Sequence, residues 1–303
     1  MRVPCRHMLL AALLSAHAAF ACMPEGPGFT PDRGTGGGTG YREPAEVRLL
    51  RSRKAARPAD RLAEYDTWYR QRSEGASTSE QARLIEEHDA MRDVLNGNYD
   101  AAIRKLLALE GIQPGRHATA GALGTAYERA GDYESALRWI NTAIDRDPEA
   151  RAGTEWLHAR ILQARTALNT DPDRLTHSPI VPLSEAGQPL GGNAYFPCAH
   201  SQSADDLMDA LYHQLAEQML FVKPEDPVVA DLLHSFARLE ETVSHPEAAS
   251  AFRALAREYS ANSEDIAKAM PAHPSDKFNI RPLVLGALLL IIALGIFLKL
   301  RTS

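Results

Sequence analysis

The sequence predicts an all-α protein, built as an array of antiparallel helix pairs and followed by one C-terminal transmembrane helix. The array is predicted by a pattern that occurs twice at a spacing of 34 residues. The first copy holds Gly97, Tyr99, Ala102 and Pro114, and the second holds Gly131, Tyr133, Ala136 and Pro148. The transmembrane helix is predicted by 17 consecutive apolar residues, 282–298, which lie between Arg281 and Lys299.

Each residue type of the repeat has a physical role in a helix–turn–helix unit. Gly131 accepts the left-handed backbone that ends a helix, because it has no Cβ to clash. Small residues such as Gly124 and Ala136 let two helices approach closely, while Tyr127 fills the space beside them. Pro148 cannot continue a helix and marks the turn into the next unit.

This 34-residue pattern resembles the tetratricopeptide repeat. The resemblance implies a right-handed superhelical array of helix pairs over residues 45–168, with the best units at 83–116 and 117–150. The first unit departs from the pattern at Asp93, where the second has Tyr127. Residues 45–73 are predicted to form a degenerate or capping unit, and residues 204–260 to form diverged helical hairpins. An unrelated helical bundle is the alternative.

In the family that the repeat resembles, the first helix of each unit lines a concave groove that binds an extended or helical peptide. The 34-residue register places a set of residues at the equivalent positions of this chain. They are Ala118, Gly121, Thr125, Glu128 and Arg129 in the second unit, and Ala152, Glu155, Ala159 and Leu162 in a long helix predicted over 151–168. A second interpretation is that these residues face water or are covered by residues 169–203.

The N-terminal residues predict export. Residues 1–21 combine a basic start, a 14-residue mostly apolar run and a small-x-small cleavage pattern, which is typical of a signal peptide. Residues 22–44 follow as a flexible linker rich in Pro and Gly. Cys22 stands where a lipidated cysteine would, but Phe20 departs from that motif, so ordinary cleavage is favoured over lipidation. Pairing of Cys22 with Cys198 stays open.

Residues 169–203 interrupt the helices with five prolines and a Gly-Gly pair. Long irregular segments inside a domain are often functional, so this insertion is a second candidate binding site. It holds Cys198 and His200, but a metal site needs three or four ligands at suitable spacing, and none is predicted.

Residues 261–281 are predicted to be a polar spacer before the transmembrane helix, and residues 299–303 a short cytoplasmic tail. If the signal peptide is cleaved, the array lies on the periplasmic side of the inner (cytoplasmic) membrane and the chain crosses once. A tail-anchored cytoplasmic protein is the alternative, and it would require an inert N-terminal segment.

The sequence favours binding over catalysis. It contains none of the common hydrolase or phosphate-binding motifs, so no catalytic residues and no cofactors are predicted. The formal net charge of −6 argues against a nucleic-acid partner. The expected function is a membrane-tethered scaffold that binds another envelope or membrane protein. The alternative is a periplasmic protein that binds a small molecule or a cell-wall ligand through residues 169–203.

Overall fold

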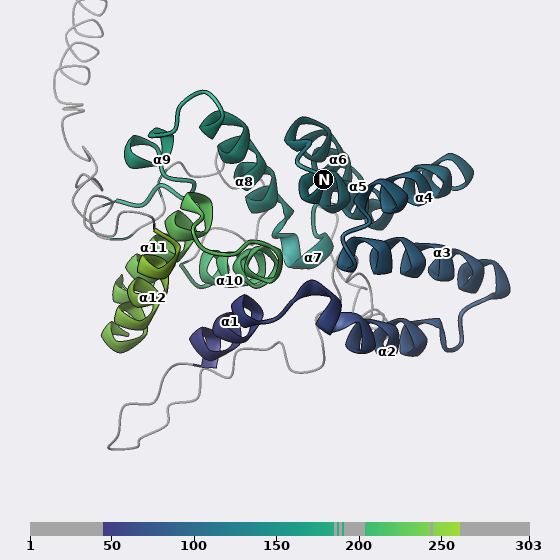
Figure 1. The fold of residues 1–303 in the computed structure, drawn as a ribbon, viewed down its shortest axis with the longest axis horizontal. Coiled ribbons are helices and arrows are strands. Elements are labelled where there is room, and N and C mark those ends of the chain that lie inside the picture. The colour runs from purple at the N-terminus through teal and green to yellow at the C-terminus, as the bar shows by residue number, and fades with distance from the viewer. Residues whose placement is uncertain (1–44, 185–186, 188–189, 191–203, 243–244, 261–303) are drawn as a thin grey trace, which may run out of the picture.

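The computed structural model describes residues 45–184, 187, 190, 204–242 and 245–260, and this part of the chain is all-α (Figure 1). The prediction of an all-α fold is therefore confirmed over these residues. The residues predicted to form the signal peptide, the linker, the spacer and the tail lie outside them, as do Cys22, Cys198 and the apolar run 282–298. Within the described residues, no helix has the length and apolar character needed to cross a bilayer.

The two sequence repeats fold into two helix pairs whose turns and second helices are equivalent. The pairs are α3 (Thr78–Leu95) with α4 (Tyr99–Ile112), and α5 (His117–Arg129) with α6 (Tyr133–Arg146), although α3 begins earlier in its unit than α5 does. In the first turn, the Gly97 amide donates to the Val94 carbonyl at 3.1 Å and the Asn98 amide to the Asp93 carbonyl at 2.8 Å. The same two bonds recur 34 residues later, from Gly131 to Glu128 and from Asp132 to Tyr127, both at 3.0 Å.

These bonds form the Schellman motif that satisfies the last carbonyls of a helix, and the glycine must be left-handed to make it. Gly97 has φ 82° and Gly131 has φ 84°. Ala102 and Ala136, the small residues of the second helices, are both fully buried. The repeat prediction is therefore matched in the backbone as well as in residue type.

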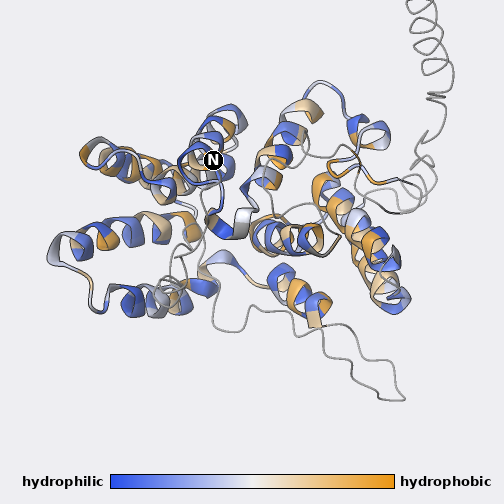
Figure 2. Cartoon of the chain, turned by 180° about the vertical axis from the view of Figure 1, so that it is seen from behind, coloured by the Kyte–Doolittle hydropathy of each residue, from blue (hydrophilic) through white to orange (hydrophobic). Residues whose placement is uncertain are grey.

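Further helices lie before and after the two pairs. Before them come α1 (Ala45–Ala55), the 3₁₀ helix η1 (Pro58–Arg61) and α2 (Leu62–Ser73); after them come α7 (Ala150–Gly153), α8 (Glu155–Leu168), α9 (Arg174–His177), α10 (Ala204–Phe221), α11 (Pro227–Thr242) and α12 (Pro246–Tyr259). Most of these helices carry polar and apolar residues along their length (Figure 2), as expected of helices that turn one face to the core.

The long helix predicted over 151–168 is broken at Thr154, which corrects that prediction. Arg151 has φ 55° and Gly153 has φ 68°, so the backbone turns left-handed twice within four residues and α7 ends there. A left-handed conformation costs a residue with a Cβ about 1–2 kcal/mol. The break directs the Arg151 side chain towards Glu155 and Glu217, with which it forms ion pairs.

Helix α10 lies in the middle of the described structure, between α1, α7 and α11 (Figure 1). Its residues Leu207, Leu211 and Leu215 are fully buried in a core shared with α1, α8, α11 and α12. Leu220, near its C-terminal end, belongs to a second core that includes residues of α2, α3, α4 and α5. Helix α10 therefore joins the two cores.

Candidate functional site

The predicted groove residues lie in the interior of the described structure. Seven of them are buried: Ala118, Gly121, Thr125 and Glu128 on α5, and Glu155, Ala159 and Leu162 on α8. Arg129 is half-buried at the end of α5, and Ala152 falls on the short helix α7. We call the side of α5 and α8 that carries these residues the inner face.

Part of the inner face is covered by α10. The Thr125 hydroxyl donates to Glu217 Oε1 at 3.4 Å, and Gln218 Nε2 donates to Glu128 Oε1 at 2.9 Å. The Arg129 guanidinium lies 4.7 Å from the centre of the Phe221 ring. These three α10 residues are spaced as one face of a helix. The inner face therefore holds a helix of this same chain, and a peptide would have to displace α10 to reach Thr125 or Glu128.

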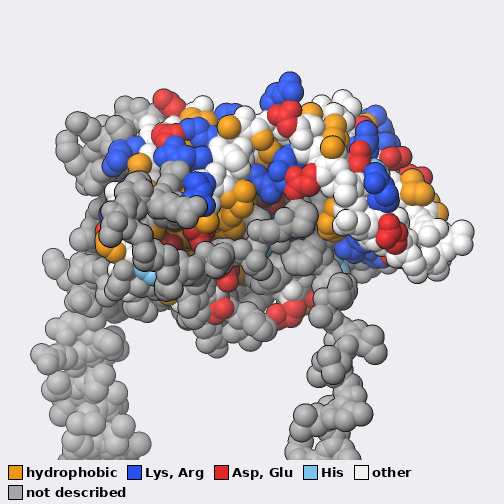
Figure 3. Space-filling model, turned by 90° about the horizontal axis from the view of Figure 1, so that it is seen from below, with side chains coloured by type: hydrophobic (Ala, Val, Ile, Leu, Met, Phe, Trp, Pro, Cys, Tyr) orange, Lys and Arg blue, Asp and Glu red, His pale blue; other side chains and the backbone are white. Residues whose placement is uncertain are grey.

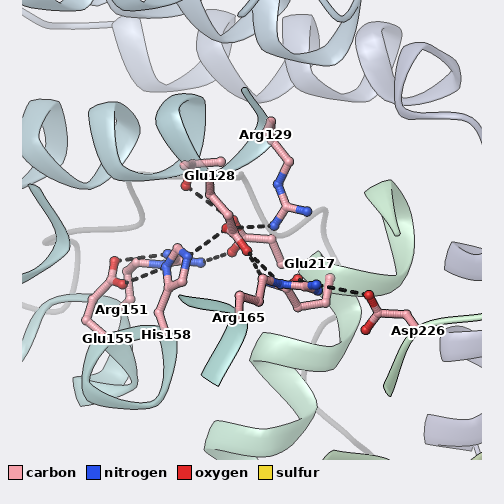
Figure 4. Close-up of polar contacts among 10 residues, drawn as sticks. Glu128, Arg129, Arg151, Glu155, His158, Arg165, Glu217 and Asp226 are labelled. Carbon is pink, nitrogen blue, oxygen red and sulfur yellow. Dashed lines mark hydrogen bonds and ion pairs between the residues drawn. The ribbon is translucent and has the colours of Figure 1, made fainter. Parts of the chain in front are cut away.

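The contact between α10 and the inner face is built around buried charges (Figure 4). Glu128 Oε2 accepts from His158 Nε2 and from Arg129 Nη2, both at 2.8 Å. The other ring nitrogen of His158, Nδ1, lies 3.3 Å from Glu155 Oε2. Arg151 joins Glu155, at 2.9 Å, to Glu217 on α10.

Arg165 closes the cluster on its other side. Its guanidinium donates to Asp226 Oδ2 at 2.9 Å and to Gln218 Oε1 at 3.1 Å, and its Nε lies 3.7 Å from Glu128 Oε1. We call these nine residues the buried charge cluster: Glu128, Arg129, Arg151, Glu155, His158, Arg165, Glu217, Gln218 and Asp226. Its four carboxylates face three guanidinium groups and one imidazole, so the charges balance when His158 is protonated.

The pKa values agree with that balance. Burial alone would lower the pKa of His158, but the adjacent Glu128 and Glu155 carboxylates raise it to about 9. Burial would raise the pKa of Glu155, but Arg151 and His158 lower it to about 2. Arg129 and His158 likewise hold the pKa of Glu128 well below its usual range against the effect of burial. At neutral pH His158 is therefore a buried cation between two carboxylates.

This assignment predicts a loss of stability in mild base. The pKa of His158 is higher in the folded chain than its unfolded value of 6.5, so its stabilisation is complete below pH 6.5 and disappears as the pH rises through about 9. A shift of this size corresponds to roughly 3 kcal/mol in the free energy of unfolding. Urea unfolding of the detergent-solubilised chain at pH 6.5 and pH 9.5 measures it. The decrease should be much smaller in His158→Gln, and an equal decrease in both proteins would contradict the assignment.

Sequence reasoning found part of this cluster and missed the rest. Glu128 and Glu155 were predicted from the repeat register, although as residues that face a groove. His158, Arg165 and Glu217 were missed, because each lies within a largely apolar helix where a polar residue gives no sign of its partner. The available signal was that Gln214, Glu217 and Gln218 share one face of an otherwise leucine-rich helix.

The described part of the insertion 169–203 packs into the core. Ile180, Val181 and Leu183 are buried there. The Ile180 amide donates to Asp231 Oδ2 at 2.9 Å, and burial raises the pKa of Asp231 to about 7. Residues 178–184 therefore have a structural role beside α11. Over the described residues, no group of three or more His, Cys, Asp or Glu side chains is placed to hold a metal ion.

Comparison of the chain with protein-family models, curated proteins and solved structures gives no match. The resemblance to the tetratricopeptide repeat therefore stays a prediction from the residues. The structure is consistent with this resemblance in two respects: the two helix pairs have matching turns, and a helix lies against the inner face.

Proposed function

We propose that the chain is a non-catalytic scaffold that binds another envelope protein. In this proposal residues 282–298 tether it to the inner membrane, and a tetratricopeptide-like, right-handed superhelical array lies on the periplasmic side. Support comes from the helix pairs α3–α4 and α5–α6, whose turns match, and from the inner face, against which one helix of this chain, α10, is packed.

Because α10 lies on the inner face, the partner is proposed to bind elsewhere. Among the described residues, the large apolar side chains that are exposed all lie on one helix pair. They are Ile85 on α3, 57% exposed, and Leu107 and Ile112 on α4, 40% and 76% exposed. Exposed apolar residues that cluster in this way mark interaction sites more often than single ones do. The proposal that a partner protein binds here is based on this clustering.

The exposed residues of α4 follow one stripe. Leu107, Ala108, Gly111 and Ile112 are spaced at one and four residues, so they share a helical face. Helices α3 and α4 are antiparallel neighbours, and the Asp93–Lys105 ion pair at 2.7 Å fixes their register. The first half of α3, with Ile85, therefore runs beside the last half of α4. We call Ile85, Leu107, Ala108, Gly111 and Ile112 the α3–α4 patch.

The charges on the α3 side of this patch indicate the chemistry of the partner. Glu86 and Asp89 are exposed on α3 next to Ile85, and no ion pair engages either of them over the described part of the chain. An amphipathic helix with an apolar stripe and flanking Lys or Arg side chains would complement both features. We therefore propose a basic amphipathic helix of another protein as the occupant.

Site-specific photo-crosslinking tests this proposal. A photoreactive residue at position 107 should crosslink in membranes to one protein, within a basic amphipathic helix, whereas the same residue at the exposed position 141 on α6 should not. The double variant Ile85→Asp/Ile112→Asp should reduce the crosslink at least tenfold. The control Gln71→Glu/Asn141→Asp adds the same charge at exposed positions outside the patch and should leave the crosslink yield at position 107 unchanged. Equal yields at positions 107 and 141 would contradict the proposal.

A further inference from the structure

The start of the described chain is basic, although the whole chain is acidic. Residues 45–61 hold six basic and two acidic residues, against a formal net charge of −6 for the chain. The basic residues are Arg48, Arg51, Arg53, Lys54, Arg57 and Arg61, and the acidic ones are Glu46 and Asp60. The positive charge of this segment therefore lies on α1 and η1.

The fold brings one acidic and one basic residue from elsewhere in the chain to α1. Glu258 on α12 accepts a hydrogen bond from Arg51 Nη1 at 2.6 Å and pairs with Lys54 as well, so one carboxylate faces two cations. Lys223 Nζ donates to the carbonyls of Lys54 and Ala56 at 2.8 and 2.7 Å. A third cation therefore sits at the C-terminal end of α1, where the helix dipole favours it.

Two further arginines of this region face outward. Arg48 is exposed on α1, and the side chain of Arg57 is 81% exposed where it pairs with Asp60. We call Arg48, Arg51, Lys54, Arg57 and Lys223 the basic end. Figure 3 views the molecule from the side of α1 and α2; Lys and Arg side chains are visible towards its left, where α1 and α12 lie, as well as in the middle and at the right of this face.

The basic end lies where the chain leaves the described structure on its way to the proposed membrane span. Glu258 is the penultimate residue of α12, and its contacts with Arg51 and Lys54 hold the end of that helix against α1. The spacer 261–281 begins three residues after Glu258. The sequence predicts a polar spacer here, and a random coil of this length would reach about 25 Å, which places α1 within reach of the bilayer surface.

We infer that the basic end is a docking surface for anionic phospholipid headgroups. This inference rests on the membrane anchor of the proposed function. Charges interact strongly with a bilayer only within a Debye length, about 8 Å at physiological salt, so α1 must approach the headgroups directly. Each cation that does so strengthens the contact by about fivefold. Helices α3 and α4, which carry the α3–α4 patch, lie on the other side of the molecule in Figure 1, so a partner could reach them while α1 contacts the bilayer.

Hydrogen exchange of the full chain in vesicles tests the inference. The chain is reconstituted into phosphatidylcholine vesicles with and without about one third phosphatidylglycerol, and flotation establishes that it is anchored. Amides of residues 45–61 should exchange at least fivefold more slowly in the anionic vesicles, and 0.5 M salt should abolish the difference. The variant Arg48→Gln/Arg57→Gln should lose most of this protection. The control Arg104→Gln/Arg138→Gln, which removes two exposed cations from α4 and α6, should keep it.

The outcomes separate the inference from the proposed function. A chain that does not float with either vesicle contradicts the membrane anchor, and the inference is overturned with it. A chain that floats but shows the same exchange in both vesicles leaves the anchor standing and overturns the lipid contact. Equal loss of protection in both variants also overturns it, because the contact would then not belong to the basic end.

Discussion

Replacing Glu128 with alanine is expected to lower the free energy of unfolding by about 3–5 kcal/mol, the usual cost of breaking a buried ion pair. Glu128 is 4% exposed and accepts hydrogen bonds from His158, Arg129 and the Gln218 amide. Its removal leaves two cations buried without their shared carboxylate. Urea unfolding of the detergent-solubilised chain near pH 7 measures the change.

Two controls sharpen this measurement. Glu134→Ala removes an exposed carboxylate from α6, the next helix, and should change the free energy of unfolding by no more than about 0.5 kcal/mol. In a Glu128→Ala background, His158→Gln should cost little more, because the imidazolium has lost its closest carboxylate. A loss below 1 kcal/mol for Glu128→Ala would show that the cluster does not hold α10 in place.

Gly124→Ala is expected to destabilise the fold by about 1–3 kcal/mol, although alanine favours a helix over glycine by about 1 kcal/mol. A Cβ at position 124 would lie 2.4 Å from Ile140 Cδ1 and 3.3 Å from the Ile140 backbone nitrogen. The side chain of Ile140 is fully buried, so it has little room to move. The close approach of α5 and α6 that the sequence predicts at Gly124 therefore requires glycine there.

The chain provides a matched control for this substitution. Gly111 is also helical, but a Cβ built there meets nothing within 4 Å, so Gly111→Ala should stabilise the chain by up to about 1 kcal/mol. Shortening the neighbour with Ile140→Val should recover part of the loss in Gly124→Ala, because it removes the Cδ1 atom that clashes. Thermal unfolding of Gly111→Ala, Gly124→Ala, Ile140→Val and the double variant Gly124→Ala/Ile140→Val gives the comparison. A stabilising Gly124→Ala would contradict the packing of α5 against α6.

Local signals in the sequence predicted most of the helices. Gly97 and Gly131 indicate where the first helix of each pair ends, because each takes the left-handed conformation that closes a helix. The chain then turns back into the second helix of the pair. Pro227 and Pro246 are the first residues of α11 and α12, a position where the missing N–H of proline costs little. The break at Thr154 was missed because Arg151, which has no intrinsic preference for positive φ, takes that conformation in a tertiary context.

The sequence predicted residues of the inner face but not the helix that covers it. The register of the repeat predicted Thr125, Glu128 and Glu155 as groove residues, and the structure buries all three at or beside the contact with α10. It did not show what lies against them, because α10 follows some 75 residues after Glu128 and carries its polar residues among leucines. The polar face of α10 can be read from the sequence, but the residues that lie against it cannot, because they are far away along the chain. For the same reason the sequence did not show that residues 178–184, which lie within the candidate binding segment 169–203, pack into a core.

Helix α10 lies on the inner face and is held there by the buried charge cluster. A double-mutant cycle on Arg151 and Glu217 measures this hold, since their ion pair joins the break after the second repeat to α10. Arg151→Ala and Glu217→Ala should each destabilise the chain, and the double variant should lose at least 1 kcal/mol less than the two losses combined. Losses that add to within about 0.5 kcal/mol would show that the two side chains do not interact, and would contradict the placement of α10.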